Sequence, residues 1–342
     1  MKMFVRVLLG LGALVVVSVI GLGVALVQSA ITPARTVGVQ VVSATDGQMR
    51  PISTVIYYPA RGEAKLTWLG LTPAMLARDA PVDVGQRPLV LISHGTAGSP
   101  TSHLDTALAL AEQGFIVAAL VHNGDNYRDQ SGVGTSNWIS DRAREVVRVT
   151  DYMLGVWDQR ASIDPERIGL FGFSAGATTA LANIGAAPDF ARVAEACRAQ
   201  PEFVCQLLPP GAELSNPRVE DARDLRIRAA LIAAPGFGMA FTADGLENVT
   251  IPVDVWVGAD DFNTPSSTNA AAIAERLPTH PSIHVVEGAG HASFLAPCGV
   301  TAVLMPPMVC ADSRGFDREA FHRTFNAAVV SFFSRSLNYS GG

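Results

Sequence analysis

A serine at position 174 stands in the motif Gly172-Phe173-Ser174-Ala175-Gly176, which has the pattern G-x-S-x-G. An apolar, strand-like run precedes the motif and a helix-compatible run follows it, which is the setting of a nucleophile elbow. In such an elbow the serine sits on a tight turn, and the flanking glycines are needed because larger side chains would collide with the neighbouring strand and helix. The sequence therefore predicts Ser174 as a nucleophile.

A base must accept the proton of this serine, because a serine hydroxyl is a weak nucleophile at neutral pH, and a third group must orient the base. Of the seven histidines, His291 lies among small residues in the run Gly288–Phe294, directly after the last expected strand. It also follows the serine in the chain, as the order serine, acid, histidine of elbow enzymes requires. We predict His291 as the base.

The acid is expected after a strand that lies between the serine and the histidine in the sequence. The apolar run 253–257 is followed by Gly258-Ala259-Asp260-Asp261, so two carboxylates compete for this role. Adjacent residues cannot usually both face one imidazole. We favour Asp261, keep Asp260 as the alternative, and leave Asp244 as a third candidate.

Backbone N–H groups must bind the oxyanion of a tetrahedral intermediate, and each donor is worth about 10²–10³ in rate. One donor is expected from Ala175, the residue after the nucleophile. The second is expected from the loop Ser93-His94-Gly95-Thr96, and Thr96 is our candidate. We expect His94 to pack beneath the loop. No carboxylate shares helical spacing with the histidines of this region, so we predict neither a metal site nor a cofactor.

The elements that position these residues alternate along the chain, which predicts an α/β fold: a mostly parallel central sheet with helices on both faces. We expect strands at 37–43, 52–58, 88–93, 115–121, 167–173, 228–234, 253–257 and 283–287. Helices are expected at 104–113, 139–157, from 175 onward, at 268–277 and at 317–336.

Two stretches interrupt the alternation. Residues 59–87 are rich in Pro and Gly, and we expect a loop there with one short helix near 73–78. Residues 188–226 form an unusually long connection. We interpret this second stretch as a small cap insertion over the site.

The N-terminus carries Lys2 and Arg6 before an uncharged apolar run from Val7 to Val27. This order is typical of an export signal, and the run is also long enough to span a bilayer. We expect residues 1–30 to be a signal peptide or a membrane anchor attached through residues 7–27. Both interpretations place the domain, residues 36–338, outside the cytoplasm, in the periplasm or secreted.

Four cysteines agree with an oxidising compartment. They allow three connectivities, which the sequence cannot separate. Because the intervening loops are short, we favour the local pairs Cys197 with Cys205 and Cys298 with Cys310. Zinc sites usually have tighter cysteine spacing, which argues against a metal at these positions.

The composition and net charge of the chain indicate which kinds of partner it can bind. Hydrophobic residues make up 49% of the chain and charged residues 16%, which excludes intrinsic disorder. The formal net charge is −6 without a cluster of Lys and Arg, so we expect no nucleic-acid partner. The expected partner is a small-molecule ester, and the sequence leaves the oligomeric state open.

The motifs taken together resemble the α/β-hydrolase superfamily. They are S-H-G-x-x-G at 93–98, G-F-S-A-G at 172–176, the strand 226–235, G-A-D-D at 258–261 and G-A-G-H-A-S-F at 288–294. Within the superfamily the chain is similar to the branch called predicted dienelactone hydrolases, which is related to platelet-activating-factor acetylhydrolases. Dienelactone hydrolases proper use a cysteine nucleophile, whereas position 174 is serine. Some acetylhydrolases place the acid after the preceding strand, which here ends in Pro235-Gly236 without a carboxylate.

The resemblance implies an exported serine esterase that cleaves short-chain or lipid-like acyl esters through an acyl-enzyme, with a role in lipid degradation. Acyl transfer, lactone hydrolysis and peptide hydrolysis use the same three residues and stay open as alternatives. An alternative of another class is a non-catalytic binding protein with the same fold. The apolar run around Leu304, Met305 and Met308 favours lipid-like esters over sugars.

Overall fold

The computed structural model describes residue 21 and residues 23–341 of the chain. Most of the expected signal or anchor segment, residues 1–30, therefore lies outside the described residues. Within the part of the chain that is described, no helix is both long enough and apolar enough to cross a membrane.

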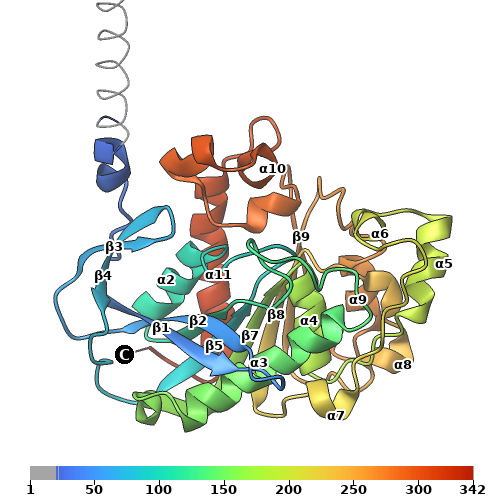
Figure 1. The fold of residues 1–342 in the computed structure, drawn as a ribbon, viewed down its shortest axis with the longest axis horizontal. Coiled ribbons are helices and arrows are strands. Elements are labelled where there is room, and N and C mark those ends of the chain that lie inside the picture. The colour runs from blue at the N-terminus through green and yellow to red at the C-terminus, as the bar shows by residue number, and fades with distance from the viewer. Residues whose placement is uncertain (1–20, 22, 342) are drawn as a thin grey trace, which may run out of the picture.

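A single sheet runs through the described domain, and its ten strands follow the order β10-β9-β8-β7-β5-β6-β2-β1-β4-β3 (Figure 1). The strands are β1 Val37–Thr45, β2 Pro51–Pro59, β3 Lys65–Leu69, β4 Thr72–Arg78, β5 Arg87–Ser93, β6 Ile116–Leu120, β7 Ile163–Phe173, β8 Ile227–Ala233, β9 Val253–Gly258 and β10 Ile283–Val286. Strands β10 to β6 in this order are mutually parallel, whereas β2 is antiparallel to both β6 and β1. The mostly parallel sheet confirms the predicted fold class.

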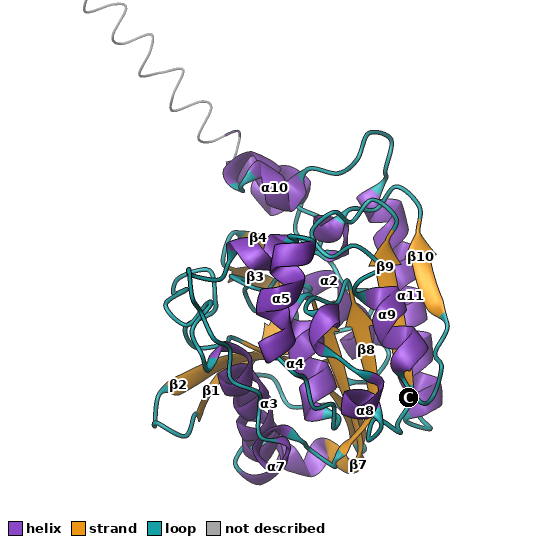
Figure 2. Cartoon of the chain, turned by 90° about the vertical axis from the view of Figure 1, so that its right-hand side faces the viewer, coloured by secondary structure: helices purple, strands orange, loops and turns teal. Residues whose placement is uncertain are grey.

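Helices cover both faces of the sheet (Figure 2). They are α2 Leu104–Glu112, α3 Trp138–Gly155, α4 Ala175–Asn183, α5 Ala191–Ala199, α6 Phe203–Gln206, α7 Val219–Ala222, α8 Ala243–Leu246, α9 Ala270–Arg276, α10 Pro307–Cys310 and α11 Arg318–Ser336. One hydrophobic cluster joins the sheet to α3, α4 and α9. A second cluster joins the opposite face to α2 and α11. Strands β5 and β6 are buried along their whole length, as strands covered on both faces must be.

The loop and short helix predicted at residues 59–87 are wrong, because β3 and β4 form an antiparallel hairpin there. Gly70, with φ of 62°, adopts the left-handed backbone that the turn between the two strands needs. The segment Ala74–Ala77 has good helix formers, but β4 pairs with β3 on one side and with β1 on the other. These pairings override the local helical preference.

Residues 188–226 contain the three short helices α5, α6 and α7. A disulfide between Cys197 and Cys205 ties α5 to α6, and a second disulfide joins Cys298 to Cys310. The structure thus forms both of the local pairs that we favour. The function of residues 188–226 as a cap stays a prediction.

Candidate active site

Ser174 lies at the turn between β7 and α4 with φ of 54° and ψ of −119°, a backbone that a residue with a side chain rarely adopts. Its N–H donates to the carbonyl of Ala233 at 3.0 Å, which anchors the turn to β8. A Cβ at Gly172 would overlap the carbonyl oxygen of Gly176, and a Cβ at Gly176 would overlap that of Ser93. Only glycine therefore fits at these two positions, two residues before and two residues after the serine.

The structure brings Ser174, His291 and Asp261 together. The Nε2 of His291 lies 3.0 Å from the Oγ of Ser174, although 117 positions separate them in the chain. The Nδ1 of His291 lies 2.8 Å from the Oδ2 of Asp261. The histidine is held by the 3₁₀ helix His291–Phe294 after β10, and its ring lies 4.9 Å from the ring of Phe173. One imidazole thus bridges a hydroxyl and a carboxylate.

The side chain of Asp261 is fully buried. The N–H of Asn263 and the N–H and hydroxyl of Thr264 donate to it at 2.8–2.9 Å. Burial alone would raise the pKa of Asp261, but the hydrogen bond and charge of His291 and the Thr264 donors hold it below the usual value. Asp261 is therefore ionised at neutral pH and fixes the orientation of the imidazole.

The remaining two candidate acids lie elsewhere. Asp260 follows the same strand, but its described interaction with this region is a backbone N–H that donates to the carbonyl of Ala289 at 3.0 Å. Asp244 is an exposed residue of α8. Within the described residues, no hydrogen bond or ion pair joins either carboxylate to His291.

The second predicted donor lies in a four-residue turn that is closed by a 3.0 Å hydrogen bond from the N–H of Gly98 to the carbonyl of Gly95. A Cβ at Gly95 would approach the Cβ of Ser174 to 3.2 Å, so the turn lies directly against the serine. Thr96 is the second residue of the turn. Ala175 begins α4, and the helix itself supplies no acceptor for its N–H. The two predicted donors thus lie on segments that flank Ser174.

Comparisons with known proteins agree with this architecture. A sequence model of the dienelactone hydrolase family matches residues 73–203, which include the Gly95–Gly98 turn and Ser174. A solved structure of a ferulic acid esterase from Streptomyces cinnamoneus has a TM-score of 0.60 at 17% identity, covering 90% of this chain and 94% of that chain. The chain has the fold of the α/β-hydrolase superfamily.

A dienelactone hydrolase from Anabaena variabilis has a TM-score of 0.48 at 16% identity, and the match covers 87% of this chain and 97% of that chain. No curated protein matches the sequence at a significant level.

Beneath the Gly95–Gly98 turn, this chain buries an ion pair that the sequence did not predict. The Nη1 of Arg142 lies 2.5 Å from the Oδ2 of Asp125, and each side chain is 1% exposed. Asp125 also accepts the N–H of Ala97 at 2.7 Å and the indole N–H of Trp138 at 2.6 Å. Arg142 donates to the carbonyl of His94. The pair therefore connects the turn to α3.

A pattern in the sequence could have identified Arg142. It lies three residues after Ile139 and four before Val146, on the stripe that α3 buries against the core. A charged residue on an apolar stripe needs a buried partner. The partner itself, Asp125, lies in an irregular loop, where no periodicity distinguishes it.

Next to the ion pair, His94 is buried as expected. Its Nδ1 lies 2.7 Å from the carbonyl of Gly95, and its Nε2 accepts the N–H of His122 at 3.3 Å. Burial, followed by the charge of Arg142, lowers the pKa of His94 to about 4. A neutral imidazole that donates through Nδ1 and accepts through Nε2 fits these contacts. His94 thus supports the turn from below, and within the part of the chain that is described no hydrogen bond joins it to Ser174.

His122 and Glu145 extend this buried network. The Nε2 of His122 lies 2.8 Å from the hydroxyl of Ser93, and its Nδ1 lies 2.8 Å from a carboxyl oxygen of Glu145. Burial raises the pKa of Glu145 to about 8 and lowers that of His122 well below its usual value. The network therefore fixes the end of β5, from which the turn emerges.

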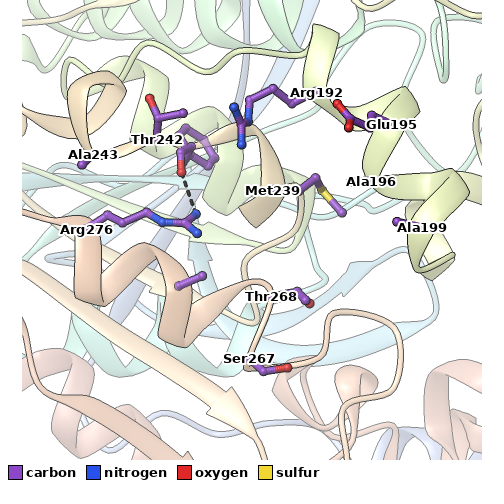
Figure 3. A pocket seen from close by; sticks show the side chains of 12 residues that line it. Arg192, Glu195, Ala196, Ala199, Met239, Thr242, Ala243, Ser267, Thr268 and Arg276 are labelled. Atoms are coloured by element: carbon purple, nitrogen blue, oxygen red, sulfur yellow. Dashed lines mark hydrogen bonds between the residues drawn. The ribbon is translucent and has the colours of Figure 1, made fainter.

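A cavity of about 530 Å³ lies at the junction of α5, α8 and α9, and none of Ser174, Asp261 and His291 lines it (Figure 3). The guanidinium of Arg276 closes one side by donating to the carbonyl of Phe241 at 2.8 Å. Nearby, the buried Glu202 accepts hydrogen bonds from Thr268 and Asn269. These contacts attach residues 188–226 to the segment that follows Asp261.

Proposed function

We propose that this chain is an exported serine hydrolase that cleaves carboxylic esters of short-chain or lipid-like acyl groups. The observation that carries the proposal is the continuous hydrogen-bonded chain from Ser174 through His291 to Asp261, with distances of 3.0 and 2.8 Å. In addition, Ser174 has the strained elbow backbone that exposes its hydroxyl.

In the proposed reaction, the Oγ of Ser174 attacks the ester carbonyl carbon while the Nε2 of His291 takes the hydroxyl proton. The ionised Asp261 stabilises the imidazolium that forms. The backbone N–H groups of Thr96 and Ala175 donate to the oxyanion of the tetrahedral intermediate. His291 then gives its proton to the departing alkoxide, which leaves as the alcohol, and the acyl group stays on Ser174.

Hydrolysis of the acyl-enzyme repeats these steps with water. His291 takes a proton from the water, the hydroxide oxygen attacks the acyl carbon, and the C–O bond to Ser174 breaks. The proton returns from His291 to the Oγ of Ser174, and the carboxylic acid leaves. No group beyond this chain and water takes part in the cycle.

Three further observations support the proposal. Two disulfides indicate an oxidising compartment, as export requires. The N-terminal sequence has a basic start followed by an apolar run. A structural neighbour is described as a ferulic acid esterase, an enzyme of ester chemistry.

The proposal is tested by labelling the protein with a fluorophosphonate and by measuring hydrolysis of p-nitrophenyl esters of increasing acyl length. We expect labelling of the wild type, none of Ser174→Ala, and a maximum in rate that identifies the acyl length. Added alcohols separate acyl transfer from hydrolysis, and a lactone and a peptide substrate test for lactonase and peptidase activity. A wild-type protein that is neither labelled nor active on any of these substrates would favour the non-catalytic binding protein.

A further inference from the structure

The β3–β4 hairpin has an apolar outer face. Along β3 the side chains alternate: Thr67 and Leu69 are buried, whereas Leu66 is 38% and Trp68 is 45% exposed. Leu71, at the turn of the hairpin, is 50% exposed. The outward side of an antiparallel hairpin usually carries polar residues. Neighbouring exposed side chains such as Leu66, Trp68 and Leu71 are therefore typical of a surface that binds another protein or a membrane.

The same hairpin forms hydrogen bonds with Ile31, near the start of the described chain. The N–H of Ile31 donates to the carbonyl of Pro73 at 3.0 Å, and the N–H of Met75 donates to the carbonyl of Ile31 at 2.8 Å. Ile31 thus forms a bridge beside Ala74 of β4.

Ile31 follows the uncharged apolar run Val7–Val27 after only three intervening residues. A fully extended chain covers at most about 3.6 Å per residue, so the end of this run lies within roughly 14 Å of the hairpin. If the run Val7–Val27 is inserted in a bilayer, the hairpin therefore lies at the surface of that bilayer.

A second group of exposed apolar side chains lies on the segment closed by the Cys298–Cys310 disulfide. Leu304 is 49%, Met305 is 37% and Met308 is 81% exposed. Figures 1 and 2 both place α10, which carries Met308, at the same end of the molecule as the N-terminal helix, residues 23–28. This segment begins at Cys298, shortly after the 3₁₀ helix His291–Phe294 ends.

We propose that this end of the molecule lies on a lipid bilayer, with the β3–β4 hairpin and the Leu304–Met308 segment at the depth of the lipid headgroups. The occupant is identified by the length and position of the apolar run, which ends beside the hairpin. Tryptophan is enriched at this depth because its ring is apolar and its N–H is polar. With a net charge of −6, the chain has no excess of positive charge to bind anionic lipids, so docking uses apolar contact with neutral lipids as well.

Tryptophan fluorescence provides a direct test, because Trp68 is exposed whereas Trp138, Trp157 and Trp256 are at most 7% exposed. The full-length chain is reconstituted into phosphatidylcholine vesicles whose acyl chains carry bromine, a short-range quencher. We expect bromine quenching of the Trp68 emission and loss of its quenching by aqueous acrylamide. Trp68→Phe identifies the share of the signal that comes from this residue and should remove both effects.

Leu71→Asp should lose most of the bromine quenching of Trp68, while Val156→Asp, a change at an exposed valine after α3, should keep it. Hydrolysis of a water-soluble p-nitrophenyl ester should stay at the wild-type rate in both variants, and the unfolding midpoint identifies any variant that fails to fold. Trp68 that stays open to acrylamide and unquenched by bromine in vesicles would overturn the proposal. Protection of Trp68 without lipid that grows with protein concentration would also overturn it, because a second copy would then cover the hairpin.

Discussion

Asp125 lies 2.5 Å from Arg142, and its carboxylate also accepts the N–H of Ala97 at 2.7 Å. Ala97 has φ of 56°, a left-handed backbone that costs free energy for alanine. One carboxylate therefore neutralises a buried guanidinium and holds the strained residue next to Thr96. The position of the predicted oxyanion donor therefore depends on a charge pair that is buried from solvent.

Replacing Asp125 by Asn should destabilise the fold by about 3–5 kcal/mol, because Arg142 would keep its hydrogen bonds to Thr179 and His94 but would be a buried charge without a carboxylate partner. The measurement is the free energy of unfolding in urea. Asp221→Asn is the matched control: its partner Arg218 is exposed and 3.1 Å away, and the loss should stay below about 1 kcal/mol. Equal losses in the two variants would show that the buried pair has no special role.

The choice between the two neighbouring acids has its own test. Asp261→Asn should lower kcat by about 10⁴-fold, because the amide cannot hold the imidazole in the tautomer that accepts the serine proton. Asp260→Asn should leave kcat close to the wild-type value, since its carboxylate has no described contact with His291. Steady-state kinetics on a p-nitrophenyl ester measure both changes, and a larger loss in the Asp260 variant would reverse the assignment.

Buried neutral histidines make stability depend on pH. Burial lowers the pKa of His103 to about 3, whereas an exposed histidine titrates near 6.5. Between pH 6.5 and pH 3, His103 is protonated in the unfolded chain but stays neutral in the native state. The stability contributed by His103 is therefore complete above pH 6.5 and is lost as the pH falls toward 3, by about 1.4 kcal/mol per pH unit.

Urea unfolding at several pH values between 7 and 4 measures this slope. His103→Gln should give a shallower dependence than the wild type, whatever its stability at pH 7. Gln48→Asn, a change at an exposed side chain that does not titrate, should leave the slope as it is. A slope that is unchanged in the His103 variant would mean that this imidazole is protonated in the native state.

Two glycines in helical segments should respond in opposite directions. Gly176→Ala places a Cβ on the carbonyl oxygen of Ser93, so we expect a loss of stability of roughly 1–3 kcal/mol or more and a displaced Ser174. Gly155→Ala, at the end of α3 where nothing lies within 4 Å of the new Cβ, should raise stability by up to about 1 kcal/mol. Melting temperatures and kcat compare the two variants.

The sequence predicted the position of Ser174, Asp261 and His291 because each follows a strand of the same parallel sheet. The carboxyl ends of such strands meet at one edge, so residues that are distant in the chain become neighbours. The motif around Ser174 is local, and its glycines carry the steric requirement that the structure shows. The sequence therefore predicts a site residue well when a local steric requirement or the end of a parallel strand fixes its position.

The β3–β4 hairpin was missed because part of its pairing is non-local: β1 pairs with β4 through Gly38 with Ala77 and Val39 with Arg78, residues that lie far apart in the sequence. The ion pair of Asp125 with Arg142 was missed for a related reason. Arg142 lies on the apolar stripe of α3, which indicates a buried partner, but that partner, Asp125, lies in a loop where no pattern distinguishes it. β7 begins at Ile163, earlier than the expected 167, since Ile163 pairs with Arg87.

The bond between Cys298 and Cys310 closes the stretch that begins shortly after His291. Material produced in a reducing cytoplasm would keep both thiols apart, and the region beside the imidazole would then be free to sample other conformations. Recombinant preparations should accordingly differ in specific activity according to the redox state of the host compartment. Mass spectrometry of the intact chain distinguishes the disulfide-bonded from the reduced protein before any kinetic comparison.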